Sequence, residues 1–421
     1  MFIESIKISN FKSFNEIELG LQQFNVVIGA NASGKSNFVS LFTFIKDIFI
    51  FGLDNAISYQ GGLDYLCPIK TETKNLHIEL LFNMEKDDTI LYHSPKKEFG
   101  ISIKKMQYIL HLDLKRNNYK IEYEKLVNNC NFYELKFENE KLKKRTKIFN
   151  GDIIFNNEAG KFDYYITGGS TINVNDIIPK FQYVEKMKTR KRLSKKSFIE
   201  NLYLYLPFSL LLSTFFKDIT IYDFAPKEAK KATPISGKID LESDGNNLAL
   251  ILNNIKKNDK KYLKLMDLTK NILPFIDQME VIPLANKSLL MNITESYAKD
   301  KSFPGPLISD GTINIISFVI ILFFENKPFI IFEEPEKSIH PFLISKIIKM
   351  MIDVSNKKRK QIILTTHNPE IVKYSGLENI LFIYRDEYGH SQISKLKDAD
   401  NIKLFTENMG VEELFIQNLL E

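Results

Sequence analysis

The sequence has few cysteines and no long hydrophobic segment. Its only cysteines are Cys67 and Cys130, too few for a disulfide framework, so a reducing compartment is expected. The longest apolar runs, 206–216 and 313–324, are shorter than the roughly 20 residues that a bilayer requires. The N-terminal segment carries the acidic Glu4 and no apolar signal core. These absences exclude a secreted disulfide-rich protein and a membrane protein, and they predict a cytoplasmic chain.

Composition gives weaker guidance than these absences. The 421 residues are 44% hydrophobic and 26% charged, which is typical of globular proteins and excludes a disordered chain. The 57 basic and 52 acidic residues leave a net charge of +5, and so small an excess does not by itself indicate nucleic-acid binding. At about 150 residues per domain, the length predicts roughly two to three domains.

Strand and helix patterns alternate at both ends of the chain. An apolar run at 24–29 is followed by a helical pattern from Ser36, and after residue 305 the apolar runs 329–334 and 361–366 alternate with helical patterns. Such alternation predicts a mostly parallel sheet with helices on both faces.

The middle of the chain has a different pattern. Short alternating runs within 76–155 predict an antiparallel sheet, and apolar blocks within 175–290 predict an inserted helical arm. The expected fold class is therefore α/β, with an antiparallel β subdomain and a helical arm. The expected segments are an N-terminal part of the core at 1–70, the antiparallel subdomain at 71–174, the helical arm at 175–300 and a C-terminal part of the core at 301–421.

A phosphate-binding loop is the strongest local motif. GANASGKS, from Gly29 to Ser36, fits G-x-x-x-x-G-K-[ST] between a predicted strand and a predicted helix. The glycines let the backbone wrap around phosphate oxygens, and its N–H groups supply a positive field. Lys35 is expected to neutralise the β- and γ-phosphates of ATP, and Ser36 to hold Mg²⁺. The residues expected to bind the nucleotide here are Gly29, Asn31, Ala32, Ser33, Gly34, Lys35, Ser36 and Asn37.

A second motif ends a predicted buried strand in two carboxylates. FIIFEEPE, at 329–336, brings Glu333 and Glu334 to the edge of the sheet, where α/β proteins bind ligands. Because adjacent strand residues point to opposite sides, the two carboxylates can differ in role. Glu333 is expected to hold Mg²⁺ and Glu334 to act as the general base on water. Taken alone, the segment also fits a solvated acidic turn.

With these motifs the sequence resembles ABC-type ATPases of the SMC/RecF/OLD-like class, in particular bacterial AAA-family ATPases of anti-phage defence systems. The resemblance rests on four motifs that occur in order, which are GANASGKSN from Gly29, ISDGT at 308–312, FEEPEKSIHP at 332–341 and TTHNP at 365–369. It covers the two end zones well and the middle only loosely. It implies an ABC-type P-loop ATPase head.

The resemblance also assigns roles to further residues. It places His367 as the switch histidine that contacts the γ-phosphate, a catalytic role beside Glu334 and Lys35. Residues 338–340 correspond to the D-loop, although Ser338 also fits a plain helix N-cap. The signature that caps ATP on a second protomer corresponds to Ser309, Asp310, Gly311 and Thr312. The resemblance thus implies a head-to-tail homodimer through two ATP sites, with higher-order assembly left open.

The sequence departs from the family pattern in several places. The metal-binding position is Glu333 where Asp is usual, Asp310 stands where transporters carry Gly, and no Q-loop glutamine can be placed, since Gln60 is typical of a turn. OLD-type relatives carry a C-terminal Toprim nuclease, but only about 25 residues follow Leu396, so no such nuclease is expected.

Two basic runs interrupt the middle zone. The run at 141–147 has five positive residues in seven, and Lys186–Lys196 has seven in eleven with no acid. Such a block attracts a phosphate backbone independently of sequence, but an exposed lobe or a docking face for an acidic partner fits equally. Reading of specific bases is not supported.

The predicted function is that of an ATP-binding and ATP-hydrolysing ABC/SMC-like ATPase. Its ATP-dependent dimerisation is expected to control a separate effector protein, in a prokaryotic anti-phage defence or toxin-type system. One alternative is a DNA-binding repair or recombination ATPase of the RecF/SMC class, which Lys186–Lys196 would favour. Another is an ATP-gated scaffold with slow turnover.

Overall fold

The computed structural model describes residues 1–68, 75–84, 89–93, 98–115, 118–138, 141–168, 196–202, 207–358, 360–396 and 411–416. The chain divides into two compact units, each made of several segments. The first unit comprises Met1–Gln22, Ala32–Ile219 and Ile383–Ile393, and the second comprises Gln23–Asn31, Thr220–Phe382 and the described parts of Ser394–Glu421. The division falls within the phosphate-loop motif, between Asn31 and Ala32.

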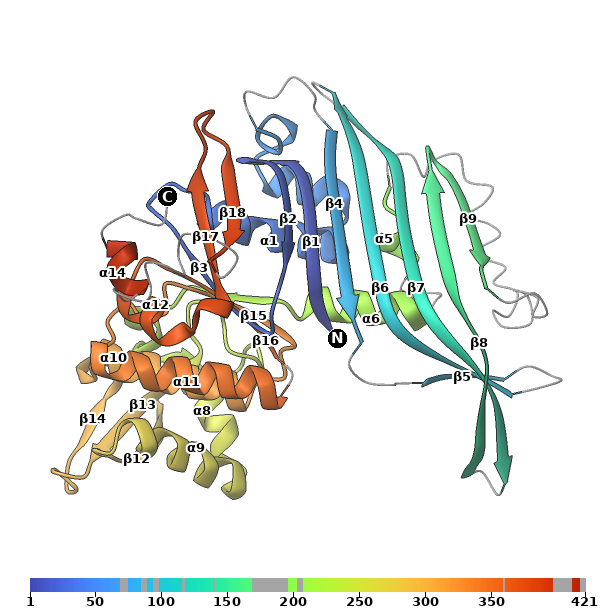
Figure 1. The fold of residues 1–421 in the computed structure, drawn as a ribbon. Coiled ribbons are helices and arrows are strands. Elements are labelled where there is room, and N and C mark those ends of the chain that lie inside the picture. Colours follow the sequence, from blue (N-terminus) through green and yellow to red (C-terminus); the bar gives the residue numbers. More distant parts are fainter. Residues whose placement is uncertain are drawn as a thin grey trace. The chain divides into compact units, whose positions relative to one another are not determined.

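An antiparallel sheet forms the framework of the first unit (Figure 1). Its strand order is β2-β1-β4-β6-β7-β8-β9, with β5 paired to β6. The alternation of Leu76, Ile78 and Leu80 with more exposed neighbours gives β4 one buried face, as the period of a strand dictates. The strands are β1 (Phe2–Phe11), β2 (Phe14–Gly20), β4 (Asn75–Asn83), β5 (Thr89–His93), β6 (Glu98–Lys115), β7 (Asn118–Glu138), β8 (Lys141–Glu158) and β9 (Lys161–Ile166).

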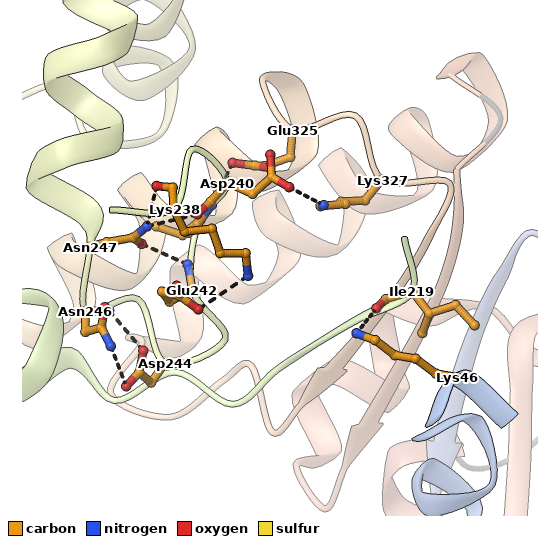
Figure 2. A network of polar contacts seen from close by, with 11 residues as sticks. Lys46, Ile219, Lys238, Asp240, Glu242, Asp244, Asn246, Asn247, Glu325 and Lys327 are labelled. Carbon is orange, nitrogen blue, oxygen red and sulfur yellow. Dashed lines mark hydrogen bonds and ion pairs between the residues drawn. The ribbon is translucent and has the colours of Figure 1, made fainter. Parts of the chain in front are cut away.

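Helices pack on this sheet through aromatic side chains. Phe44 and Phe38 of helix α1 (Lys35–Phe51) contact Phe11 and Phe14, with ring centroids 5.7 and 6.5 Å apart. Helix α1 is also tied to a distant segment, because Lys46 Nζ donates to the carbonyl of Ile219 at 2.6 Å (Figure 2). The other helices described in the first unit are α2 (Leu53–Tyr59), η1 (Leu63–Tyr65), α5 (Ile199–Leu202) and α6 (Pro207–Lys217).

Parallel strands form the framework of the second unit (Figure 1). Their order is β10 (Thr220–Tyr222), β15 (Phe329–Glu333), β16 (Gln361–Thr366), β3 (Phe24–Ile28) and the first residues of β17 (Ile380–Arg385). The rest of β17, from Ile383, belongs to the first unit, and β18 (Ser391–Lys395) follows it in sequence. All residues of β3 and β16 are buried, which is why their sequences are mostly apolar and do not alternate. The helices in its described part are α7 (Pro226–Ala229), α8 (Leu248–Lys256), α9 (Asp259–Ile272), η2 (Gly305–Leu307), α10 (Asp310–Phe323), α11 (Pro341–Lys358), α12 (Pro369–Ser375), η3 (Leu377–Asn379) and α14 (Val411–Ile416).

The second unit also contains a small sheet, whose strands precede α8 and follow α9 in the sequence. It has the order β11 (Thr233–Pro234), β13 (Ser288–Glu295), β12 (Ile276–Leu284), with β14 (Ser302–Pro304) also paired to β13. The segment expected as a helical arm therefore contains strands as well as helices in its described part. Buried residues are adjacent along β13, so its sequence alternates only weakly and does not predict a strand.

A polar network shapes the loop that precedes α8 (Figure 2). The buried Asn247 accepts from the amide of Glu242 at 2.8 Å and donates to the carbonyl of Asp240 at 2.9 Å. Glu325, just beyond α10, accepts from the amide of Leu241 at 3.0 Å, and Lys327 pairs with Asp240 at 2.5 Å. The network thus fastens the loop to the C-terminal end of α10.

The structure confirms an α/β fold with an antiparallel subsheet, and it corrects the proportion of parallel pairing. The strands are mixed, because parallel ladders occur mainly among the five strands β10, β15, β16, β3 and β17, while β1, β2 and β4 to β9 pair antiparallel. The long hairpin β6–β7 confirms the antiparallel pairing expected within 76–155. The antiparallel pair β1–β2 instead lies within 1–70, the segment expected as part of the mostly parallel core. Within the described residues, no helix is long and apolar enough to span a membrane.

Candidate nucleotide-binding and hydrolysis site

The phosphate-loop motif connects strand β3 to helix α1, as its sequence predicts. The backbone turns through the left-handed region at Ala32, with φ 64°, and at Gly34, with φ 125°. Helix α1 then begins with the amide of Phe38 donating to the carbonyl of Gly34 at 2.9 Å. Left-handed backbone suits Gly34 but is costly for Ala32, so Ala32 must be held by its surroundings.

Side chains from two distant hairpins hold this loop within the first unit. Arg385 Nε donates to the carbonyl of Ala32 at 3.0 Å, and Ser391 Oγ donates to the carbonyl of Ser33 at 2.5 Å. Ser391 Oγ also lies 2.8 Å from Ser13 Oγ, which accepts from Asn37 Nδ2 at 2.7 Å. Within the phosphate-loop pattern, these contacts involve the backbone of the variable positions Ala32 and Ser33.

A pocket of about 530 Å³ lies next to the loop in the first unit, within the range of about 300–1,000 Å³ found for small-molecule sites. Its basic side chains are Arg385 and Lys12, and burial lowers the pKa of Lys12. Gln60 ends α2 in a turn, as predicted, and faces this pocket. The lining is completed by Ser13, Asn37, Tyr65, Cys67, Pro68, Tyr388, Gly389 and His390.

The acidic strand end lies in the second unit. Glu333 is the last residue of β15 and pairs in register with Thr365 of β16. Burial raises the pKa of Glu333, and the charge of Asp223 raises it further. Glu334 follows in the left-handed region, with φ 45°, and its amide donates to the carbonyl of Thr365 at 2.9 Å.

The side chain of Glu334 is oriented by two basic groups. One carboxylate oxygen lies 3.0 Å from His367 Nδ1, and the other lies 3.4 Å from Lys337 Nζ. Lys337 in turn pairs with Asp223 at 3.1 Å. Burial alone would lower the pKa of Lys337, but its hydrogen bond to Asp223 and the two carboxylate charges raise it. The predicted base and the predicted switch histidine are therefore in direct contact.

The half-buried carboxyl of Glu336 supports the next turn of the chain. Glu336 accepts from Thr366 Oγ1 at 2.5 Å, and the same hydroxyl oxygen accepts from the amide of Asn368 at 2.9 Å. Asn368 then caps α12 by accepting from the amide of Glu370 at 2.8 Å. Burial raises the pKa of Glu336, which favours its protonated form. These bonds position the backbone on both sides of His367.

The signature motif begins helix α10 in the second unit. Ser309 Oγ caps the helix by accepting from the amide of Thr312 at 3.2 Å, and Asp310 pairs with Lys230. A Cβ on Gly311 would lie 2.6 Å from the carbonyl oxygen of Ser338. Only glycine allows this approach, which brings the signature against the segment that resembles the D-loop.

The predicted site residues fall into two groups by unit. Ala32, Ser33, Gly34, Lys35, Ser36 and Asn37 belong to the first unit, while Gly29, Asn31, Ser309, Asp310, Gly311, Thr312, Glu333, Glu334 and His367 belong to the second. Five residues that contact this site or the loop are not predicted from the sequence, namely Ser13, Lys337, Asp223, Arg385 and Ser391. Of these, only Lys337 stands within a recognised motif, so the others carried no local signal. In Lys186–Lys196, all residues except Lys196 lie outside the described residues.

The chain belongs to the family described as "AAA domain, putative AbiEii toxin, Type IV TA system", whose model matches residues 24–373. The family expected from the ordered motifs is thereby confirmed. Membership in this group of P-loop ATPases implies nucleotide binding. No curated protein matches the chain significantly.

Several solved structures are similar over nearly the whole chain. One is an Smc head bound to the C-winged helix domain of ScpA, with 13% identity, coverage of 94% of this chain and 98% of that chain, and a TM-score of 0.47. Another is the SMC head domain from Thermotoga maritima, with 12% identity, coverage of 94% and 99%, and a TM-score of 0.44. A third is an Smc head domain with an extended coiled coil from Pyrococcus furiosus, bound to the C-terminal domain of ScpA, with 13% identity, coverage of 96% and 99%, and a TM-score of 0.43.

Proposed function

We propose that the chain hydrolyses ATP to ADP and phosphate. The observation that carries this proposal is the contact of Glu334 with His367, at 3.0 Å, at the end of a buried strand. A general base needs a fixed carboxylate with an accessible oxygen, and here the left-handed backbone, His367 and Lys337 fix it. The phosphate-loop motif supplies the matching binding element in the same chain.

In this proposal each residue has a separate task. Lys35 and the loop amides bind the β- and γ-phosphates. Glu334 accepts a proton from water while the water oxygen bonds to the γ-phosphorus and the bond to the bridging oxygen of ADP breaks. His367 contacts the γ-phosphate and keeps Glu334 oriented.

The carboxylate of Glu333 is suited to Mg²⁺. Its raised pKa reflects burial and repulsion from Asp223, and a divalent cation would relieve both. Within the described residues no group of three or more His, Cys, Asp and Glu side chains forms a metal site. Mg²⁺ commonly takes only one or two protein carboxylates, with the rest of its shell from phosphates and water. We therefore assign it to Glu333 and Ser36, where it would neutralise developing phosphate charge.

Dimerisation and partner control belong to the same proposal. The signature residues Ser309 to Thr312 cap the ATP of a second copy, so that a head-to-tail homodimer forms when ATP is bound and opens after hydrolysis. The core consists of 1–70 and 301–421, with 71–174 and 175–300 inserted. The dimer controls a separate effector protein in a defence or toxin-type system. The family description, with its toxin–antitoxin system, supports this role.

Direct DNA binding is the second candidate, and one surface favours it. Lys143, Lys144 and Lys147 are exposed on strand β8, within the basic run at 141–147. Lys143 is already paired with Glu138, which reduces the charge available to a phosphate backbone. A slow ATP-gated scaffold remains the third candidate.

Steady-state ATP hydrolysis tests these proposals, with and without double-stranded DNA. Wild-type protein should release phosphate, and Glu334→Gln should retain ATP binding, accumulate dimer and lose about 10²–10⁴-fold in turnover. Hydrolysis by Glu334→Gln at the wild-type rate would exclude Glu334 as the base. Stimulation by DNA that fades with added salt favours the DNA-binding function, whereas indifference to DNA favours control by a protein partner.

A further inference from the structure

The phosphate loop contains two successive carbonyl groups that side chains from elsewhere in the chain hold. The carbonyl of Ala32 accepts from Arg385 Nε at 3.0 Å, and the carbonyl of Ser33 accepts from Ser391 Oγ at 2.5 Å. Arg385 lies 353 residues from Ala32 in sequence and Ser391 lies 358 from Ser33. All four residues belong to the first unit. We call Arg385 and Ser391 the carbonyl clamp.

The clamp has a rigid support. Arg385 Nη1 donates to the carbonyl of Gly389 at 2.7 Å, which closes the turn between β17 and β18. Asp386 Oδ1 accepts from the amides of Tyr388, at 3.1 Å, and His390, at 2.7 Å. The amide of the buried Ser391 donates to the carbonyl of Ser13 at 2.7 Å. The clamp side chains therefore start from a fixed turn, and little freedom remains for them to lose when they bond the loop.

Holding a carbonyl also sets the direction of an amide. In a planar trans peptide, the C=O of one residue and the N–H of the next point in opposite directions. Fixing the carbonyls of Ala32 and Ser33 therefore fixes the N–H groups of Ser33 and Gly34. In a phosphate loop, successive N–H groups are the donors that cradle the phosphates.

The loop needs such support because its backbone is strained. Ala32 has φ 64°, a conformation that costs free energy for a residue with a Cβ. The approach of the clamp is also close, since a Cβ on Gly34 would lie 2.2 Å from Ser391 Oγ. Gly34 is thus required both for its own turn and for the space that the clamp occupies.

We propose that Arg385 and Ser391 are positioning residues that orient the phosphate-binding amides of the loop. This inference rests on the proposed function, since it concerns how the same loop binds nucleotide. The clamp residues bond the side of each peptide away from the phosphates, so they act through the loop and not on the ligand. Their loss frees the amides to point elsewhere and weakens phosphate binding.

The test compares Arg385→Met and Ser391→Ala with wild type in ADP titration and in steady-state ATP hydrolysis. Each variant should raise the Kd for ADP and the KM for ATP about tenfold, as expected for one lost hydrogen bond that supports binding. The kcat should stay within about twofold, because binding of substrate and transition state weakens equally. Ser375→Ala is the matched control, since its buried hydroxyl donates to the carbonyl of Ile371 at 2.5 Å inside α12. It should leave Kd and KM unchanged.

The outcomes separate this inference from the proposed function. If both clamp variants bind ADP within twofold of wild type while Lys35→Ala does not bind, the clamp has no positioning role and the proposed function stands. If wild type binds no nucleotide, the proposed function is wrong and the inference falls with it. Arg385 is exposed, so Arg385→Met decides the matter if Ser391→Ala does not fold.

Discussion

The phosphate loop and the acidic strand end solve the same conformational problem in different ways. Each contains a non-glycine residue in the left-handed region, Ala32 with φ 64° and Glu334 with φ 45°. Ala32 is held through its carbonyl by Arg385, a side chain from far along the chain. Glu334 is held through its amide by the carbonyl of Thr365 in the adjacent strand.

The two regions also differ in charge. The contacts around the loop are made by serines, an asparagine and a guanidinium, none of which changes charge near neutral pH. The acidic strand end instead contains carboxylates that face His367 and Lys337. The difference fits the proposed roles, in which the loop binds phosphate with a fixed shape and the acidic strand end carries the ionisable groups of the hydrolysis step. The following experiments test the loop, the acidic strand end and, for comparison, a buried carboxyl elsewhere in the first unit, from the largest expected effect to the smallest.

Lys35→Ala should abolish measurable nucleotide binding. The loop then keeps its shape but loses the cation that offsets phosphate charge, and we expect affinity for ADP and ATP to fall at least about a hundredfold. Calorimetric titration measures this. Lys46→Ala is the control, because Lys46 lies on the same helix and donates to the carbonyl of Ile219 at 2.6 Å. If Lys35→Ala binds nucleotide with an affinity within a few-fold of wild type, the loop is not part of the nucleotide-binding site.

Glu124→Gln should change how stability depends on pH. Glu124 is a fully buried carboxyl of the first unit that accepts from Tyr108, Ser197 and Phe198, and burial raises its pKa to about 7. A raised pKa contributes stability below the unfolded value that is lost as pH rises through about 7. The contribution is on the order of 3 kcal/mol.

Urea unfolding of wild type and Glu124→Gln at pH 5 and pH 8 measures that contribution. Wild type should lose more stability than the variant between the two pH values. Other carboxyls with a raised pKa, such as Glu336, are present in both proteins, so the difference between the two proteins isolates Glu124. As a control, Glu158→Gln at an exposed position should lose as much unfolding free energy between pH 5 and pH 8 as wild type does. If the unfolding free energy of wild type and of Glu124→Gln depends on pH in the same way, Glu124 is ionised at both pH values.

Gly311→Ala should slow turnover about tenfold without changing nucleotide affinity. The added Cβ would lie 2.6 Å from the carbonyl of Ser338, a contact that forces backbone apart at the start of α10. Phosphate release and ADP titration measure the two effects. Gly237→Ala is the control, since its Cβ would meet only Leu250 at an ordinary 3.4 Å. Unchanged turnover would show that the close packing of Gly311 against Ser338 is not needed for ATP hydrolysis.

Lys337→Met should reduce kcat a few-fold at neutral pH and more at acid pH. Lys337 lowers the pKa of Glu333 by its charge, while burial and Asp223 raise it. Without Lys337, that pKa rises further, so Glu333 becomes protonated at a higher pH. The acid limb of the pH–rate profile should move up accordingly, whereas Lys346→Met on α11 should leave it in place. An unmoved limb would mean that another group governs acid inactivation.

Local patterns were sufficient for the elements that contain the site. The apolar runs at 24–29, 329–334 and 361–366 became β3, β15 and β16, and the helical pattern from Ser36 became α1. These strands and this helix could be predicted because a buried strand followed by a helix has a recognisable pattern of apolar residues along consecutive positions. The weakly alternating β12 and β13 could not be recognised in the same way.

By itself the sequence determined the family, the phosphate-loop motif and the order of strand, loop and helix, because each depends on residues that are neighbours along the chain. Only the tertiary structure decided that Ser391 meets Ser13 across 378 positions, that Lys337 bridges Asp223 and Glu334, and that Gly311 must admit the carbonyl of Ser338. Hydrogen bonds and close approaches between distant segments depend on how strands pair and helices pack. The local sequence pattern therefore does not predict these contacts.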